Sequence, residues 1–96
     1  KLKAEGADLI ICLSHLGYEY QTDKISDRKL ARQTEGIDLI IGGHTHTFLE
    51  KPTVERNLIG KSTLINQVGW AGIQVGRIDF YVGKNVKSKS DLIIID

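Results

Sequence analysis

Three histidines carry the clearest chemical signal in this sequence. His15 follows an apolar run that ends at Leu13, and His44 and His46 follow a second apolar run that ends at Ile41. Neutral imidazole binds zinc and also suits iron, copper and nickel, so three imidazoles gathered in one place supply most of a metal's ligands. A single loop histidine is more often a solvated side chain. Three that share one edge of a sheet favour a metal site.

The residues around the histidines favour a turn rather than a nucleophile. Gly42 and Gly43 free the backbone to turn sharply and to approach other groups closely just before His44. Ser14 and Thr45 flank histidines, but such hydroxyls more often bond to local backbone than attack a substrate. We therefore assign neither of them a catalytic role.

Carboxylates are the weak part of this candidate site. Asp8 and Asp38 begin the two apolar runs, so they lie at the opposite strand ends, roughly 17–20 Å from the histidines for strands of ordinary length. Three loop acids, Glu19, Asp23 and Glu50, are expected to be solvated surface charges. The sequence therefore offers no acid that would bridge two metals.

The elements that must position the histidines form a strand–helix–strand unit. The tetrapeptide Asp-Leu-Ile-Ile occurs at 8–11, 38–41 and 91–94, with spacings too unequal for a repeat protein, and such runs are typical of buried strands. Ser26 is a candidate N-cap and Gly36 a candidate stop for a helix between the first two runs. Strand, helix and strand predict a right-handed crossover. Ligands bind at the carboxyl ends of strands in such sheets, where the histidines lie.

The second half of the chain predicts antiparallel strands. A strand over 53–56 pairs through the turn 57–61 with a strand over 62–68. A longer strand follows over 73–82, with a possible bulge at Gly76, and 83–90 reads as a hairpin loop or linker before the last strand. The fold class is therefore α/β, a mixed sheet with a βαβ unit followed by antiparallel strands.

Composition narrows the possible partners. Thirteen Lys and Arg against twelve Asp and Glu give a net charge of +1, which provides no overall field for nucleic acid or an anionic membrane. No apolar run reaches the ~20 residues of a membrane span. Cys12 is the single cysteine and cannot form an intrachain disulfide. We expect neither a nucleic-acid partner nor a membrane span.

Two motifs make a resemblance specific. The segment DLIICLSHLG at 8–17 and the segment GIDLIIGGHTHT at 36–47 are similar to the 5′-nucleotidase branch of the calcineurin-like metallophosphoesterases. The segments 60–69 and 72–79 look like the closing strands of the same catalytic domain. The resemblance implies that residues 1–96 are the C-terminal part of one metallophosphoesterase β-sandwich, with its N-terminal part and a nucleotide-binding C-terminal domain absent.

The resemblance also implies a site. Two divalent ions, zinc, manganese, iron or cobalt, are expected in the parent protein, with His15 and His44 on one ion and His46 on the other, while Gly43 and Thr45 shape the turn. The family's bridging Asp, Asn ligand and catalytic His come from early motifs that this sequence does not contain. We expect a nucleotide substrate and an exported or periplasmic parent. The isolated chain is expected to be inactive and to self-associate through an uncovered strand edge and apolar face.

Two alternatives remain at this stage. The chain could be a non-catalytic metal-binding or structural module with one three-histidine site. A metallo-β-lactamase-type hydrolase also begins from a His-x-His motif, but Thr47 and Phe48 occupy the places where an Asp and another His should follow. The second alternative is therefore much weaker than the first.

Overall fold

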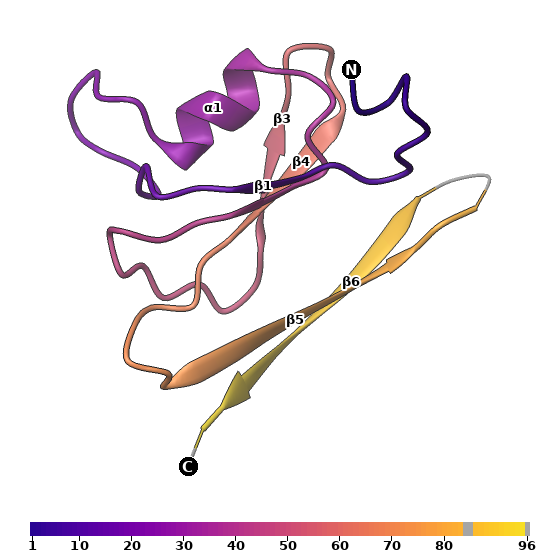
Figure 1. Cartoon of the computed structure of the whole chain (residues 1–96). Helices are drawn as coiled ribbons and strands as arrows, with labels where there is room; N and C mark the ends of the chain where they lie inside the picture. Colours follow the sequence, from indigo (N-terminus) through magenta and orange to yellow (C-terminus); the bar gives the residue numbers. More distant parts are fainter. Residues whose placement is uncertain (84–85, 96) are drawn as a thin grey trace.

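A four-stranded mixed sheet and a two-stranded hairpin make up the fold (Figure 1). The computed structural model describes residues 1–83 and 86–95. The sheet has the strand order β1-β2-β4-β3, in which β1 and β2 and also β2 and β4 are parallel, and β3 and β4 are antiparallel. The predicted α/β class with a βαβ unit and later antiparallel strands is confirmed. The elements are β1 (Ile11–Leu13), α1 (Asp27–Gln33), β2 (Leu39–Ile41), β3 (Thr53–Arg56), β4 (Ser62–Asn66), β5 (Gln74–Tyr81) and β6 (Lys87–Ile94).

Helix α1 begins and ends close to its predicted limits. Ser26 is the N-cap, and its Oγ accepts a hydrogen bond of 3.3 Å from the Lys29 amide. The helix ends at Gln33, because Thr34 already has extended dihedral angles. The helix is therefore a little shorter than the segment from Ser26 to Gly36 had indicated. Because the helix is short, its stability depends more on packing against the sheet than on helix propensity.

The core lies between α1 and the central strands of the sheet. Ala31, Ile40 and Ile65 are fully buried and pack together, one from α1, one from β2 and one from β4. Four partly buried side chains surround them: Cys12, Tyr18, Leu30 and Ile37. Cys12 is therefore a partly buried free thiol that packs against the core.

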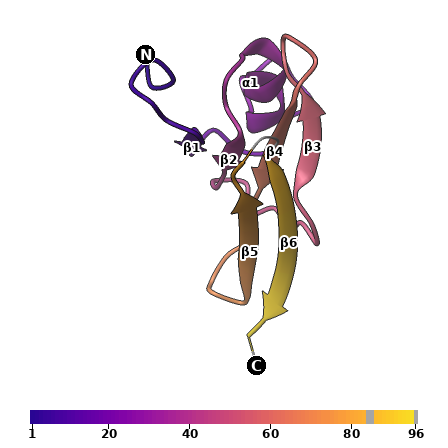
Figure 2. The same cartoon turned by 90° about the vertical axis from the view of Figure 1, so that its right-hand side faces the viewer.

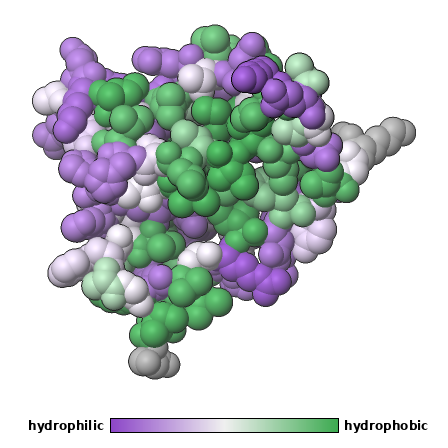
Figure 3. All heavy atoms as spheres, in the orientation of Figure 1, coloured by the Kyte–Doolittle hydropathy of each residue, from purple (hydrophilic) through white to green (hydrophobic). Residues whose placement is uncertain are grey.

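Burial on both faces holds for the centre of β2 but not for β1. Leu39 and Ile40 are buried, whereas Ile11 and Ile41 are about half exposed and Leu13 is 79% exposed. Among the strands that the structure describes, β1 has a neighbour on one side only. Apolar side chains gather across the middle of the face that Figure 3 shows. The sheet edge at β1 is thus both unpaired and apolar.

Hairpin β5–β6 forms a second layer beside the sheet (Figure 2). Its ladder runs without interruption from Gln74 opposite Ile94 to Tyr81 opposite Lys87, so the predicted bulge at Gly76 is wrong. Gly76 instead permits close approach of the layers, since a Cβ there would lie 2.6 Å from Asn66 Nδ2. Lys87–Ser90 belong to β6 rather than to a loop, and residues 84 and 85 of the predicted connection lie outside the described residues.

Candidate metal centre

His15 and His44 meet at the carboxyl ends of β1 and β2. Backbone hydrogen bonds continue past both strands, from the Ser14 amide to Ile41 O and from the Gly42 amide to Asn66 O, each 2.9 Å. These bonds fix where the two histidine-bearing turns leave the sheet. His44 Nδ1 lies 3.2 Å from His15 Nε2, and the two rings are edge to face with centroids 4.9 Å apart. Two residues 29 positions apart in the sequence thus present ring nitrogens to one another.

Two of the three histidines have an unusual backbone conformation. His44 has φ of 69° and His46 has φ of 51°, both in the left-handed region that most side chains avoid. Such strain persists only where the surrounding structure enforces it, and it concentrates at functional sites. The turn 42–47 therefore holds its imidazoles at a conformational cost.

His46 does not join the other two rings. Its imidazole stacks on Trp70, with centroids 5.7 Å apart and ring planes 5° from parallel. Trp70 is 58% exposed and lies in the turn between β4 and β5. The resemblance implied that His46 would serve a different metal from His15 and His44, and that assignment stays a prediction. Trp70 was not anticipated as its neighbour, because the sequence gives no sign of a contact between these two loops.

Thr45 connects three segments around the turn. Its Oγ1 accepts a hydrogen bond of 3.0 Å from the Tyr18 amide and lies 2.8 Å from Thr47 Oγ1. The same hydroxyl lies 3.4 Å from Gln67 Oε1. Gly43 lies against His15, because a Cβ on Gly43 would be 3.4 Å from His15 Nδ1. Thr45 and Gly43 thus each lie close to a residue that follows β1, Tyr18 in one case and His15 in the other.

Known proteins similar to this chain are nucleotide phosphoesterases. The trifunctional nucleotide phosphoesterase protein YfkN of Bacillus subtilis is 40% identical over 75 residues, which cover 78% of this chain and 5% of that protein. An apyrase of Tabanus yao is 34% identical over 84% of this chain and 16% of its own length. A snake venom 5′-nucleotidase of Macrovipera lebetinus is 41% identical over 51% of this chain and 10% of its length. No protein-family model matches the sequence.

A solved structure agrees with these relatives. The crystal structure of the 5′-nucleotidase precursor from Thermus thermophilus superposes with a TM-score of 0.84 and 32% identity, covering 98% of this chain and 20% of that one. The chain is homologous to the 5′-nucleotidases and apyrases. The predicted resemblance is thereby confirmed. This 5′-nucleotidase homologue spans one fifth or less of each of these four proteins.

The acids of this 5′-nucleotidase homologue lie where the sequence placed them. Asp38 stands at the amino end of β2, where its carboxylate accepts a hydrogen bond of 2.9 Å from the Ile10 amide. Glu19 pairs with Arg28 at 2.8 Å on the surface, and Asp23 is fully exposed. Within residues 1–83 and 86–95, no group of three or more His, Cys, Asp or Glu side chains is arranged to hold a metal ion.

Asp27 is a buried acid that the sequence analysis did not single out. It is the first residue of α1, it is fully buried, and its Oδ1 accepts a hydrogen bond of 2.5 Å from Ser14 Oγ. Burial raises the pKa of the Asp27 carboxyl above its ordinary value, and the bond from Ser14 opposes that rise. An acid in the first turn of a helix is usually a solvated charge that stabilises the helix through its dipole. The contact between Asp27 and Ser14 indicates that Asp27 has a further role.

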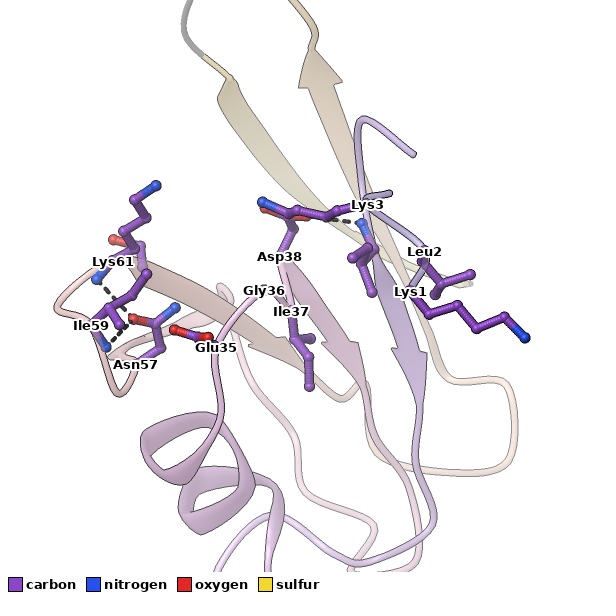
Figure 4. Close-up of a pocket in the computed structure, with 12 residues that line it drawn as sticks. Lys1, Leu2, Lys3, Glu35, Gly36, Ile37, Asp38, Asn57, Ile59 and Lys61 are labelled. Carbon is purple, nitrogen blue, oxygen red and sulfur yellow. Dashed lines mark hydrogen bonds between the residues drawn. The ribbon is translucent and has the colours of Figure 1, made fainter. Parts of the chain in front are cut away.

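One cavity in the described part of the chain lies away from the histidines. It measures about 640 Å³ and opens at the amino ends of the strands, where Asp38, Asn57 and Lys61 contribute to its walls (Figure 4). In its wall, Asn57 Oδ1 accepts hydrogen bonds from the Ile59 and Lys61 amides. No helix among the described residues has the length and apolar character of a membrane span.

Proposed function

We propose that this chain supplies histidine ligands to the two-metal centre of a nucleotide phosphoesterase, with His15 and His44 on one ion and His46 on the other. One observation carries the proposal. His15 Nε2 and His44 Nδ1 are 3.2 Å apart, and two ligand nitrogens that each lie about 2.0–2.1 Å from a tetrahedral zinc are roughly 3.3 Å apart. The pair therefore already has the separation that two ligands of one ion require.

The donor chemistry of these residues fits a divalent transition metal. All three imidazoles are solvent-exposed, so an ion can reach them without opening the core. The left-handed backbone at His44 and His46 supports a functional turn, because such backbone strain concentrates at functional sites.

Residues outside this chain are proposed to complete the site. The described residues group no carboxylate with these histidines as a set of three or more metal ligands, and a bridging acid is what a two-metal phosphoesterase needs. Two bound ions would supply a clamp for phosphoryl oxygens and an activated water. The role of His15, His44 and His46 in that reaction is to hold the ions, and the acid–base groups come from elsewhere in the parent. We therefore propose that the 96-residue chain by itself is inactive.

Nucleotides are the proposed substrates of the parent protein. The support comes from the relatives, which include a nucleotide phosphoesterase, an apyrase and 5′-nucleotidases. Export of the parent is also proposed, because one relative is a venom protein and the structural neighbour is a precursor. Both statements rest on homology rather than on residues of this chain.

The test is a metal titration of the full protein that carries this chain, with the isolated chain measured beside it. We expect His15→Ala and His44→Ala each to weaken binding at one ion, and His46→Ala to weaken binding at the other. Lys61→Ala is the matched control, because Lys61 is exposed at the opposite edge of the sheet. Unchanged binding in the His15 and His44 variants would contradict the proposal.

Activity separates the enzyme from the non-catalytic alternative. Phosphate release from nucleotides should require metal in the full protein and should be absent from the isolated chain. Metal binding by the full protein without hydrolysis would favour a structural metal site instead. Hydrolysis by the isolated chain would refute its proposed inactivity.

A further inference from the structure

Two buried polar atoms beneath the histidine-bearing turns have no hydrogen-bond partner among the described residues. They are Asp27 Oδ2 and Gln67 Nε2. Asp27 is fully buried and Gln67 is 3% exposed, so neither atom reaches bulk water. An unpaired carboxylate oxygen and an unpaired amide N–H are costly inside a protein, and they are chemically complementary as acceptor and donor.

Asp27 is tied to the turn that carries His15. Its Oδ1 accepts the hydrogen bond from Ser14 Oγ, and Ser14 Oγ in turn accepts one of 3.2 Å from the Leu16 amide. The Asp27 amide donates to Gly17 O at 2.8 Å. The residues on both sides of His15 therefore depend on the position of this one carboxylate.

Gln67 is tied in the same way to the turn that carries His44 and His46. Its Oε1 accepts a hydrogen bond of 2.6 Å from the Thr47 amide and lies 3.4 Å from Thr45 Oγ1. Gln67 follows directly after β4, so it holds this turn against a strand of the sheet. Each histidine-bearing turn thus has its own buried polar anchor.

Gly42 brings the two anchors within reach of each other. A Cβ on Gly42 would lie within contact distance of both free atoms, 3.3 Å from Gln67 Nε2 and closer still to Asp27 Oδ2. The two atoms are therefore no farther apart than the sum of these two distances. One buried water, or a direct hydrogen bond after a small shift, closes such a span.

We propose that Asp27 and Gln67 pair beneath Gly42 and act as positioning residues that hold His15 and His44 at metal-binding separation. This inference rests on the proposed metal function and adds two residues that do not touch the metal. The pair joins the turn after β1 to the turn after β2. The backbone hydrogen bonds of the sheet hold these two segments only as far as Ser14 and Gly42. Gly42 is required because any side chain there would occupy the space of the pair.

A reciprocal exchange tests the pairing in the full protein. The Asp27→Asn side chain can still accept the hydrogen bond from Ser14, but its amide N–H then faces the N–H of Gln67 Nε2. The Gln67→Glu side chain can still accept the hydrogen bond from the Thr47 amide, but its second carboxyl oxygen then faces Asp27 Oδ2. The double variant Asp27→Asn with Gln67→Glu restores one donor and one acceptor with the polarity reversed. Recovery in the double variant shows that the effect depends on the pairing of these two side chains rather than on either residue alone.

Cobalt(II) is the probe, because its visible absorption reports both binding and ligand geometry. Asp27→Asn is expected to weaken cobalt binding about 10- to 100-fold and to change the spectrum, the usual effect of removing a group that orients metal ligands. The double variant should recover most of the affinity and the wild-type spectrum. Wild-type affinity in Asp27→Asn, or a double variant that binds no better than Asp27→Asn, would overturn the proposal.

A metal-free measurement keeps this inference distinct from the proposed function. Nuclear Overhauser contacts between the His15 and His44 rings should be present in the wild type and the double variant and lost in Asp27→Asn, while contacts among Ala31, Ile40 and Ile65 remain. If His15→Ala leaves cobalt binding unchanged, the metal function fails, and these ring contacts still decide the pairing. Ring contacts that persist in Asp27→Asn would refute the pairing whatever the metal result.

Discussion

Adjacent glycines before His44 provide a matched pair of substitutions. Gly42→Ala places a Cβ far inside van der Waals contact of Asp27 Oδ2, whereas Gly43→Ala places its Cβ no closer than 3.4 Å to any side chain or backbone atom beyond its chain neighbours. Neither glycine has a positive φ, so alanine fits the backbone at both positions. The two variants therefore differ in the space around one methyl group.

The expected difference follows from two terms. Replacing glycine by alanine stabilises a protein by about 0.4–1 kcal/mol through the unfolded chain, and this gain is common to both variants. Overpacking a buried site costs about 1–3 kcal/mol, and only Gly42→Ala incurs it, because Asp27 is held by Ser14 and cannot withdraw freely. Gly42→Ala should thus be about 1–3 kcal/mol less stable than Gly43→Ala.

Thermal and urea unfolding measure this difference. For a chain of this size, 1 kcal/mol corresponds to about 4–8 °C in Tm, so the two melting curves should be well separated. Equal stability of the two variants would refute the reasoning, because it would mean that Asp27 does not occupy the space beneath Gly42. A loss in Gly43→Ala alone would point to contacts with His15 as the tighter constraint.

Three further predictions address the core, the buried acid and the sheet edge. Ile40→Ala should lower the free energy of unfolding by about 2–5 kcal/mol in urea, and a loss no greater than that of Val54→Ala at a largely exposed position would contradict it. Because burial raises the pKa of Asp27 above 3.8, the folded state binds this proton more tightly than the unfolded state. The unfolding free energy of the wild type relative to Asp27→Asn should therefore fall as pH rises from 3.8 through the raised pKa, and a constant or rising difference would oppose this. The isolated chain should elute as an oligomer in size-exclusion chromatography and shift toward monomer on Leu13→Lys, since Leu13 is 79% exposed on the edge strand β1. A monomeric wild type would count against self-association.

Local pattern was sufficient where burial and chain direction decide the structure. The first two of the three Asp-Leu-Ile-Ile runs predicted parallel strands, and parallel strands place the residues that follow them at one edge. The meeting of His15 and His44 follows from that rule alone. His46 required more, because its contact with Trp70 depends on how the turn after β4 folds back over the turn after β2.

Tertiary contacts account for what the sequence could not predict. Gly76 interrupts the alternation of apolar and polar residues as a bulge would. The ladder is nevertheless regular there, and the missing side chain allows Asn66 of the other layer to approach closely. Asp27 resembles an ordinary first-turn acid until Ser14, which lies 13 residues earlier, is seen to donate to it. In both cases, the residue type reflects a neighbour that is distant in the sequence.

The parallel pairing of β1 with β2 has a consequence for the order of folding. Ile11 pairs with Leu39, so the chain must complete the crossover through α1 before His15 and His44 become neighbours. An ion bound between them, as proposed, would act as a removable cross-link that closes this long loop and secures β1 to the sheet. Its contribution would grow with the logarithm of the free metal concentration. The most exposed strand of the sheet would then be the one whose attachment responds to metal supply.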